Sequence, residues 1–247
     1  MKVILASSLG GSIKVNGERI PTALIEANGL LHRIKSIWPN KAKVIILCGS
    51  PDDYNKNDSV YNCLKESLSL SGLSLSSFEK CDDRNEEIIE RLQDMDVIIF
   101  AGGHVPTQNA FMNKLGLAEK MKNYNGVVVA WSAGSMNCAE NVYAGPEWEG
   151  EAIDPNYQRW IPGLGLTKVN ILPHFQSLRG EFLDGLRIIE DITYADSMGH
   201  EILALNDGSY IVIEDNVETL YGEAYSIKDG CQKQICKNGE SLVLKRK

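Results

Sequence analysis

A serine set among small residues is the side chain of this sequence best suited to nucleophilic chemistry. Ser132 lies in the segment A-W-S-A-G at 130–134, an apolar run at 126–129 precedes it, and residues 135–140 can begin a helix. A buried strand, a tight turn with a serine at its tip and a following helix form the context of a nucleophile elbow. The usual pattern G-x-S-x-G has glycine where this chain has Ala130. The alternative is an ordinary strand-to-helix turn that Ser132 caps.

A serine needs a base to lose its proton at neutral pH, and this chain has four histidines. His174 is the candidate, because it follows an apolar stretch and a proline that ends the strand, which aims the imidazole at the edge where Ser132 is expected. The alternative for His174 is a partly buried structural histidine. The pair Gly102-Gly103 suits an oxyanion loop, since glycine lets backbone N–H groups approach a carbonyl closely. We expect the N–H groups of Gly103 and Ala133 to be the donors.

The third member of a serine–histidine triad is a carboxylate that orients the imidazole. Five acidic residues lie where they could do so, and the residues alone favour none of them: Glu147, Asp154, Asp196, Glu201 and Asp207.

Apolar runs without alternation recur along the first half of the chain, as is typical of parallel strands buried on both faces. They lie at 3–7, 43–48, 96–101 and 127–131. Helices are expected between and after them, at 21–38, 59–70, 85–93, 107–124 and 178–195. This alternation predicts an α/β fold with a doubly wound, mainly parallel sheet, whose ligands bind at the carboxyl ends of the strands. Short alternating runs after residue 200, separated by turns, predict C-terminal antiparallel edge hairpins.

Composition narrows the class of protein. The 247 residues, 43% of them hydrophobic, suit one α/β hydrolytic domain over 1–247. A net charge of −8 without a basic run argues against nucleic acid as a partner. No apolar segment is long enough to span a membrane or to serve as a signal peptide. Six cysteines without metal-ligand spacing indicate reduced thiols in a cytoplasmic protein, with no metal and no cofactor.

The motifs taken together carry a resemblance. Gly102-Gly103, then W-S-A-G at 131–134, then I-D-P-N at 153–156, then P-H-F at 173–175 occur in this order. In these segments the chain resembles the dipeptidase E and cyanophycinase family of serine peptidases, over about residues 3–213. The order serine then histidine fits that family and does not fit α/β-hydrolases, in which an acid usually precedes the histidine.

The resemblance implies a flavodoxin-like sandwich, similar to class I glutamine amidotransferases. It also implies a nucleophile at Ser132 and a base at His174. The family's acid lies in a late L-x-E-G-like turn, which L-N-D-G at 205–208 matches with Asp207 in place of glutamate. Asp207 is therefore the expected acid, and Glu201 is the alternative. Where the family often has asparagine after its glycines this chain has His104, which we expect to contact substrate.

The resemblance implies a peptidase that acts on small peptides, including peptides with N-terminal aspartate, through an acyl-enzyme. Arg159 is the expected partner of a substrate carboxylate, because a forked guanidinium suits it, and Arg179, which follows His174, is the alternative. The loop over 145–163 is expected to roof the site. Two other classes stay open: an amidase, esterase or isopeptidase on the same scaffold, and a catalytically silent binding protein. The expected partner is a small peptide, and a homodimer is compatible with the sequence.

Overall fold

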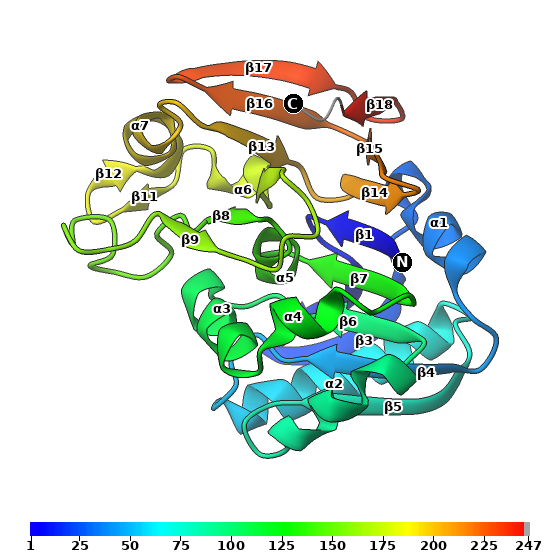
Figure 1. Ribbon diagram of the computed structural model, residues 1–247. Coiled ribbons are helices and arrows are strands. Elements are labelled where there is room, and N and C mark those ends of the chain that lie inside the picture. Colours follow the sequence, from blue (N-terminus) through cyan, green and yellow to red (C-terminus); the bar gives the residue numbers. More distant parts are fainter. Residues whose placement is uncertain (245–247) are drawn as a thin grey trace.

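The structure is a computed structural model that describes residues 1–244; the last three residues of the predicted domain lie outside the described part. Within that part, an eight-stranded sheet crosses the molecule in the order β18-β15-β14-β1-β7-β6-β4-β5 (Figure 1). Its strands are β1 (Lys2–Ala6), β4 (Ala42–Leu47), β5 (Leu75–Cys81), β6 (Val97–Phe100), β7 (Val127–Trp131), β14 (Tyr210–Glu214), β15 (Val217–Tyr221) and β18 (Ser241–Leu244). Strands β1, β7, β6, β4 and β5 run parallel, whereas β14, β15 and β18 are antiparallel additions at one edge.

Strand register brings the expected site segments to one edge of the sheet. Phe100 in β6 pairs with Ala130 in β7, and Ala6 in β1 pairs with Trp131. The glycines after β6, the serine after β7 and Ser7 after β1 therefore leave the sheet together at its carboxyl edge. Ligand sites in open α/β sheets occupy this position.

Helices cover both faces of the sheet, as a doubly wound fold requires. One face packs against α1 (Leu30–Ile37) and α2 (Tyr54–Leu70) through side chains such as Ile4 and Ile46. The other packs against the 3₁₀ segment η2 (Glu86–Asp94), α3 (Val105–Lys114), α4 (Leu117–Met121) and α5 (Ala133–Asn137), through Val3, Leu5 and Phe100. Successive residues of a strand point to opposite faces of the sheet. A continuous Val/Ile run therefore places apolar side chains on both faces, and each face is covered by helices. The predicted α/β doubly wound, flavodoxin-like class is confirmed.

A second sheet lies beside the antiparallel edge, along the upper side of Figure 1. Its order is β10-β13-β16-β17, with β10 (Asn170–Leu172), β13 (Glu201–Leu205), β16 (Ala224–Lys228) and β17 (Cys231–Cys236). The expected edge hairpins are present, but they divide between the two sheets: β14 and β15 extend the central sheet, whereas β16 and β17 continue the second one.

Two-stranded hairpins and short helices complete the described chain. The hairpins are β2 (Gly10–Val15) with β3 (Glu18–Leu24), β8 (Asn141–Tyr143) with β9 (Trp160–Pro162), and β11 (Phe182–Leu183) with β12 (Leu186–Arg187). The short helices are η1 (Ala27–Gly29), α6 (Phe175–Leu178), the π-helical η3 (Ile188–Thr193) and α7 (Tyr194–Asp196).

Two predicted helices are wrong over much of their length. The helix expected at 21–38 is restricted to α1, because residues 18–24 pair with β2 around a turn in which Asn16 and Gly17 have φ of 49° and 85°. The helix expected at 178–195 is interrupted by left-handed Gly180 and Gly185, between and after which β11 and β12 form. Glycine takes this conformation at little cost, so it favours a turn over a continuing helix.

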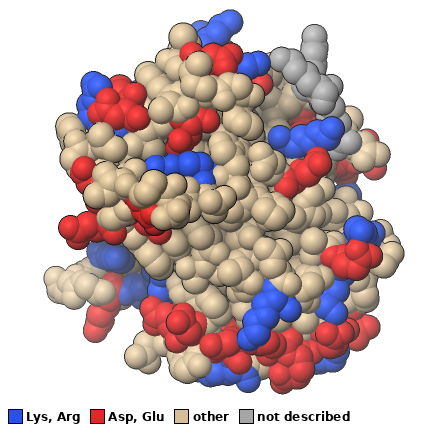
Figure 2. All heavy atoms as spheres, turned by 60° about the vertical axis from the view of Figure 1, so that its left-hand side comes forward, with Lys and Arg blue, Asp and Glu red and all other residues tan. Residues whose placement is uncertain are grey.

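Over residues 1–244, no helix combines the length and the apolar character needed to cross a bilayer. On the face seen in Figure 2, basic and acidic side chains are interspersed over a largely uncharged surface.

Candidate active site

Ser132 occupies a strained backbone position at the end of β7. Its φ of 52° and ψ of −125° are rare for a residue with a side chain, and such strain costs about 1–3 kcal/mol. The turn is held by two backbone bonds, from Ser132 N–H to the Ala6 carbonyl at 3.1 Å and from Met136 N–H to the Ser132 carbonyl at 3.1 Å. A Cβ on Gly134 would lie 2.3 Å from the Phe100 carbonyl oxygen, so glycine is required there. This is the backbone of a nucleophile elbow.

Ala130 needs no such freedom, which explains why alanine replaces the first glycine of the usual pattern. It is a regular residue of β7, paired with Phe100 and Leu5 and fully buried.

His174 lies in a left-handed conformation, with φ of 56°, between Pro173 and α6. Its backbone N–H donates to Ser7 Oγ at 2.8 Å, and its Nδ1 lies 2.7 Å from Oδ1 of Asp207. The structure therefore joins the expected base to the expected acid. With Nδ1 engaged by a carboxylate, Nε2 is the ring nitrogen left for a serine and its substrate.

Asp207 is held by three side chains. Ser7 Oγ donates to Oδ1 at 2.8 Å, and Gln176 Nε2 donates to Oδ2 at 2.8 Å, in addition to the contact with His174. The Asp207 N–H in turn donates to Gln176 Oε1 at 2.8 Å. Burial acts to raise the pKa of Asp207, but the hydrogen bonds from His174, Ser7 and Gln176 outweigh it and lower that pKa. Asp207 is thus kept as a carboxylate.

Sequence reasoning missed Ser7 and Gln176. Ser7 ends the first predicted strand at the carboxyl edge of the sheet, and Gln176 is two residues from the expected base. These two positions were the features of the sequence that could have indicated a role for Ser7 and Gln176 at the site.

The alternative acid, Glu201, is the first residue of β13, whereas Asp207 follows the last residue of that strand, Leu205. Glu201 and Leu205 lie about 13 Å apart along the strand. Oε1 of Glu201 accepts from Ser226 Oγ at 2.6 Å. Two other candidates are also engaged elsewhere: Asp196 accepts from the Tyr143 hydroxyl and Asp154 from the Asn156 N–H. Of the five sequence candidates, Asp207 is the one that the structure brings to His174.

Two cavities meet at Ser132, His174 and Glu147. The polar cleft, of about 510 Å³, is also lined by Arg19, Lys56, Gly103, His104, Trp131 and Trp148. The apolar pocket, of about 220 Å³, is also lined by Met136, Tyr143, Leu172, Leu178, Ile188 and Ile192. A substrate carbonyl at Ser132 would therefore border both cavities.

The glycine loop after β6 packs backbone against backbone. A Cβ on Gly103 would lie 2.7 Å from the Gly49 carbonyl oxygen, and one on Gly49 would lie 2.1 Å from that of Gly102. Glycine is therefore needed on both loops. The expected oxyanion donors belong to this loop and to the first residue of α5, Ala133, and Gly103 lines the polar cleft.

His104 is buried under the expected roof loop. Its ring stacks on Trp148 with centroids 3.7 Å apart, its Nδ1 contacts Thr107 Oγ1 at 2.8 Å, and its Nε2 lies 2.9 Å from Glu151 Oε1. Burial lowers the pKa of His104, although Glu151 opposes the shift. Glu151 also accepts from the backbone N–H groups of Glu147 and Trp148, so the loop is pinned over the polar cleft.

Arg159 is directed away from the expected site. Its guanidinium donates to the Ala152 carbonyl at 2.9 Å and lies 3.7 Å from Asp196 Oδ1. It does not line either cavity at Ser132, as far as residues 1–244 define them. The cations that do line the polar cleft are Arg19 and Lys56, which the sequence analysis did not identify.

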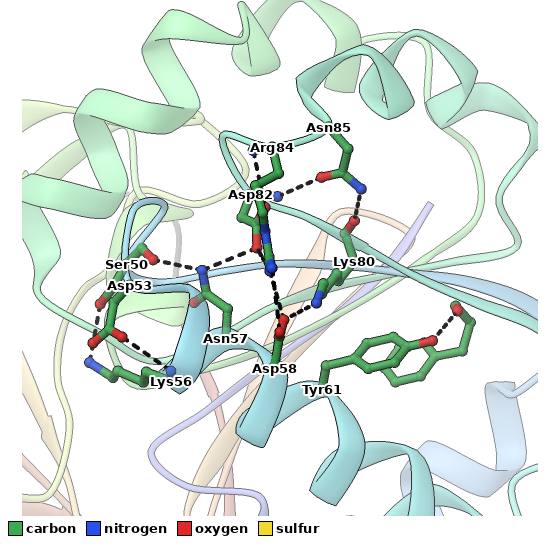
Figure 3. A network of polar contacts seen from close by, with 11 residues as sticks. Ser50, Asp53, Lys56, Asn57, Asp58, Tyr61, Lys80, Asp82, Arg84 and Asn85 are labelled. Atoms are coloured by element: carbon green, nitrogen blue, oxygen red, sulfur yellow. Dashed lines mark hydrogen bonds and ion pairs between the residues drawn. The ribbon is translucent and has the colours of Figure 1, made fainter.

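A polar network fixes the start of α2 and with it Lys56 (Figure 3). Asp53 caps the helix by accepting from the Lys56 N–H at 3.1 Å, and Lys56 Nζ donates to Ser50 Oγ at 3.1 Å. Asn57 Nδ2 ties the Ser50 carbonyl to buried Asp82. Lys56 thus belongs to an ordered helical turn at the cleft.

Glu147 sits where the two cavities meet. The residue as a whole is exposed, yet the protein around its carboxyl desolvates that group and, together with Glu151, raises its pKa to about 7. No group of three or more His, Cys, Asp or Glu within 1–244 is gathered as a metal ion would require.

Residues 31–220, most of the chain, match the model of peptidase family S51. The chain belongs to peptidase family S51. This is the dipeptidase E family, and the chain is therefore a serine-type peptidase, as its motifs predicted. No curated protein sequence matches it.

A crystal structure from Listeria monocytogenes EGD-e, provisionally described there as a peptidase E protein, is similar to this S51 chain with a TM-score of 0.58. The two are 15% identical, and the match covers 95% of this chain and 98% of the other. At that identity the likeness shows the fold alone.

Proposed function

We propose that this S51 peptidase hydrolyses small peptides through a triad of Ser132, His174 and Asp207. The observation that carries the proposal is the 2.7 Å contact between His174 Nδ1 and Asp207, with His174 and Ser132 lining the same two cavities. Membership of a serine peptidase family supports the same assignment.

In the proposed reaction, Ser132 Oγ attacks the peptide carbonyl carbon while His174 Nε2 takes the hydroxyl proton. The C–N bond then breaks, and His174 gives that proton to the leaving amine. Water attacks the resulting acyl-enzyme and passes a proton to His174; the ester bond then breaks, His174 returns that proton to Ser132 Oγ, and the acid product leaves. The N–H groups of Gly103 and Ala133 stabilise the oxyanion, each contributing roughly 3 kcal/mol.

The pinned loop supports the restriction to small peptides. Trp148 stacks on His104, and Glu151 holds the backbone of the loop, so Glu147 and Trp148 wall the cleft beside Ser132. A long polypeptide would have to displace this wall to reach Ser132, so a protein substrate such as casein should not be cleaved.

Charge in the polar cleft supports an acidic N-terminal residue in the substrate. We assign its carboxylate to Lys56 and Arg19, in place of Arg159, because these two cations line the cleft. The peptide's α-ammonium is assigned to Glu147, which lines both cavities next to Ser132. A charge-assisted contact contributes roughly 1.5–3 kcal/mol, so Lys56→Met should raise KM for Asp-Ala at least tenfold, and that for Ala-Ala far less.

The test is covalent labelling with a fluorophosphonate, combined with a dipeptide library. The native protein should label and should hydrolyse Asp-initiated dipeptides, whereas Ser132→Ala should do neither. Ser36→Ala is the matched control, since its exposed hydroxyl bonds only to the Arg33 carbonyl among the described residues. Labelling of Ser132→Ala at the native rate would refute the nucleophile. Labelling without peptide turnover, or turnover of esters alone, would favour the binding-protein or esterase alternative.

A further inference from the structure

The apolar pocket and the polar cleft both border Ser132, but their walls differ in chemistry. Met136, Leu172 and Ile192 are almost fully buried side chains of the wall of the apolar pocket. Among the described residues, neither lysine nor arginine lines it. An acidic side chain would find no cation there.

Apart from Ser132, the pocket wall has two hydroxyl groups, and both are already used by the protein. The Tyr143 hydroxyl donates to Asp196 at 2.9 Å, and Thr193 Oγ1 donates to the Ile188 carbonyl at 2.8 Å. What Tyr143 and Thr193 offer the pocket is therefore their carbon surface. Away from Ser132, His174 and Glu147, where the two cavities meet, this wall favours apolar groups and offers polar groups no partner.

The position of the pocket relates it to one side of the scissile bond. Leu172, Pro173 and Leu178, which flank His174 in the chain, line the apolar pocket, whereas Gly102 and Gly103 line the polar cleft. A histidine that protonates the leaving amine must lie on the leaving-group side. His174 lines both cavities, but the residues that flank it line only the apolar pocket, so we assign this pocket to the leaving-group side and the cleft with Arg19 and Lys56 to the other.

We infer that the apolar pocket is a specificity site for the side chain of the residue that follows the scissile bond, and that it selects a branched apolar side chain of the size of leucine. The inference rests on the proposed function for the orientation of the peptide. The favoured substrate is then a dipeptide with an acidic first residue and an apolar second residue, such as Asp-Leu. The apolar pocket has a volume of about 220 Å³, which fits one side chain rather than a longer peptide.

Binding to Ser132→Ala protein, measured by titration calorimetry, tests the inference without turnover. Asp-Leu should bind about 10- to 100-fold more tightly than Asp-Gly, the ratio expected for burying a leucine side chain. Leu-Asp, which reverses the two residues, should bind more weakly than Asp-Leu.

Two wall substitutions, each added to Ser132→Ala, should change the preference in opposite directions. Ile188→Trp fills the pocket from a half-exposed position and should bring the Asp-Leu to Asp-Gly ratio close to one. Leu178→Ala enlarges the pocket and should favour Asp-Phe over Asp-Leu. Leu70→Trp, at a side chain 60% exposed at the end of α2, is the control and should leave every ratio unchanged.

Equal affinities for Asp-Leu and Asp-Gly, tighter binding of Leu-Asp than of Asp-Leu, or an unchanged ratio in the Ile188→Trp protein would each overturn the inference. Absence of turnover by the native enzyme would refute the proposed function instead, and the affinity ratios would still decide the pocket.

Discussion

Asp82 and Asp207 each follow the carboxyl end of a strand, and each accepts several hydrogen bonds, but their partners differ in kind. Asp82, fully buried, pairs with Arg84 at 2.6 Å and with Asn57 (Figure 3). Asp207, with 40% of its side chain exposed, pairs with His174. In both, burial acts to raise the pKa and the hydrogen bonds lower it.

The difference lies in what the partner can do with a proton. Arginine is always charged, so the pair of Asp82 and Arg84 has no proton to transfer. Through Asn57 and Asp58 of α2, which contact Asp82 and Arg84, it ties the end of β5 to that helix. Histidine can gain and lose a proton near neutral pH, so Asp207 orients a group that is able to shuttle one. An aspartate carboxylate thus supports structure at Asp82 and chemistry at Asp207.

The largest effect on activity should follow from removing the negative charge of Asp207. Asp207→Asn should lower kcat for a dipeptide by about 10³- to 10⁴-fold, because the amide no longer holds the correct tautomer of His174. Steady-state kinetics would measure it, with circular dichroism to confirm the fold. A loss below tenfold would mean that Asp207 does not act as the triad's acid.

Asp82→Asn should lower the stability of the fold and leave catalysis unchanged, in contrast to Asp207→Asn. The substitution takes from the partly exposed Arg84 one of its two carboxylate partners, Asp58 being the other, and we expect the free energy of unfolding to fall by about 2 kcal/mol, with kcat of the folded enzyme unchanged. Because the pKa of Asp82 is lowered, its stabilisation is present above about pH 4 and is lost as the pH falls further. Urea unfolding at pH 7 and pH 3 would measure this: the difference in free energy of unfolding between the native and Asp82→Asn proteins should be smaller at pH 3. Asp94→Asn, at an exposed site, is the control, and a loss as small as the control's would contradict the prediction.

Glu147 offers a smaller effect that depends on pH. Its pKa is raised to about 7, so the folded state holds a proton that the unfolded state releases near pH 4.5, and stability falls as the pH rises between these values. Glu147→Gln should therefore be more stable than the native protein at pH 8, by about 1 kcal/mol once partial exposure is allowed for, and equal to it at pH 4. Thermal melts at both pH values measure the difference, and equal Tm differences at pH 4 and pH 8 would refute it.

The smallest effect is expected at Glu201. Its carboxylate contacts Ser226 at the far end of β13 from Asp207, so Glu201→Gln should change kcat/KM less than about twofold. A tenfold loss in the Glu201→Gln enzyme, with Asp207→Asn unaffected, would exchange the roles of the two residues.

The sequence by itself determined the features that depend on neighbours along the chain. The parallel strands follow from unbroken Val/Ile runs such as 127–129, and the elbow at Ser132 follows from the small residues around it. That His174 follows a strand ended by Pro173 was also visible in the sequence, but this strand, β10, belongs to the second sheet, and only the packing of the two sheets brings His174 to the cavities that Ser132 lines. The helices at 21–38 and 178–195 failed because glycine turns and strand pairing outweighed local helical pattern.

Tertiary structure decided which distant groups meet. Ser7 bonds to Asp207 across 200 residues, and no local pattern specifies that contact. It also selected Asp207 among five carboxylates, turned Arg159 toward Asp196, and brought Arg19 and Lys56 to the cleft. The physical reason is that a charged side chain takes the partner that the packing of the chain places within reach, and sequence distance does not encode that packing.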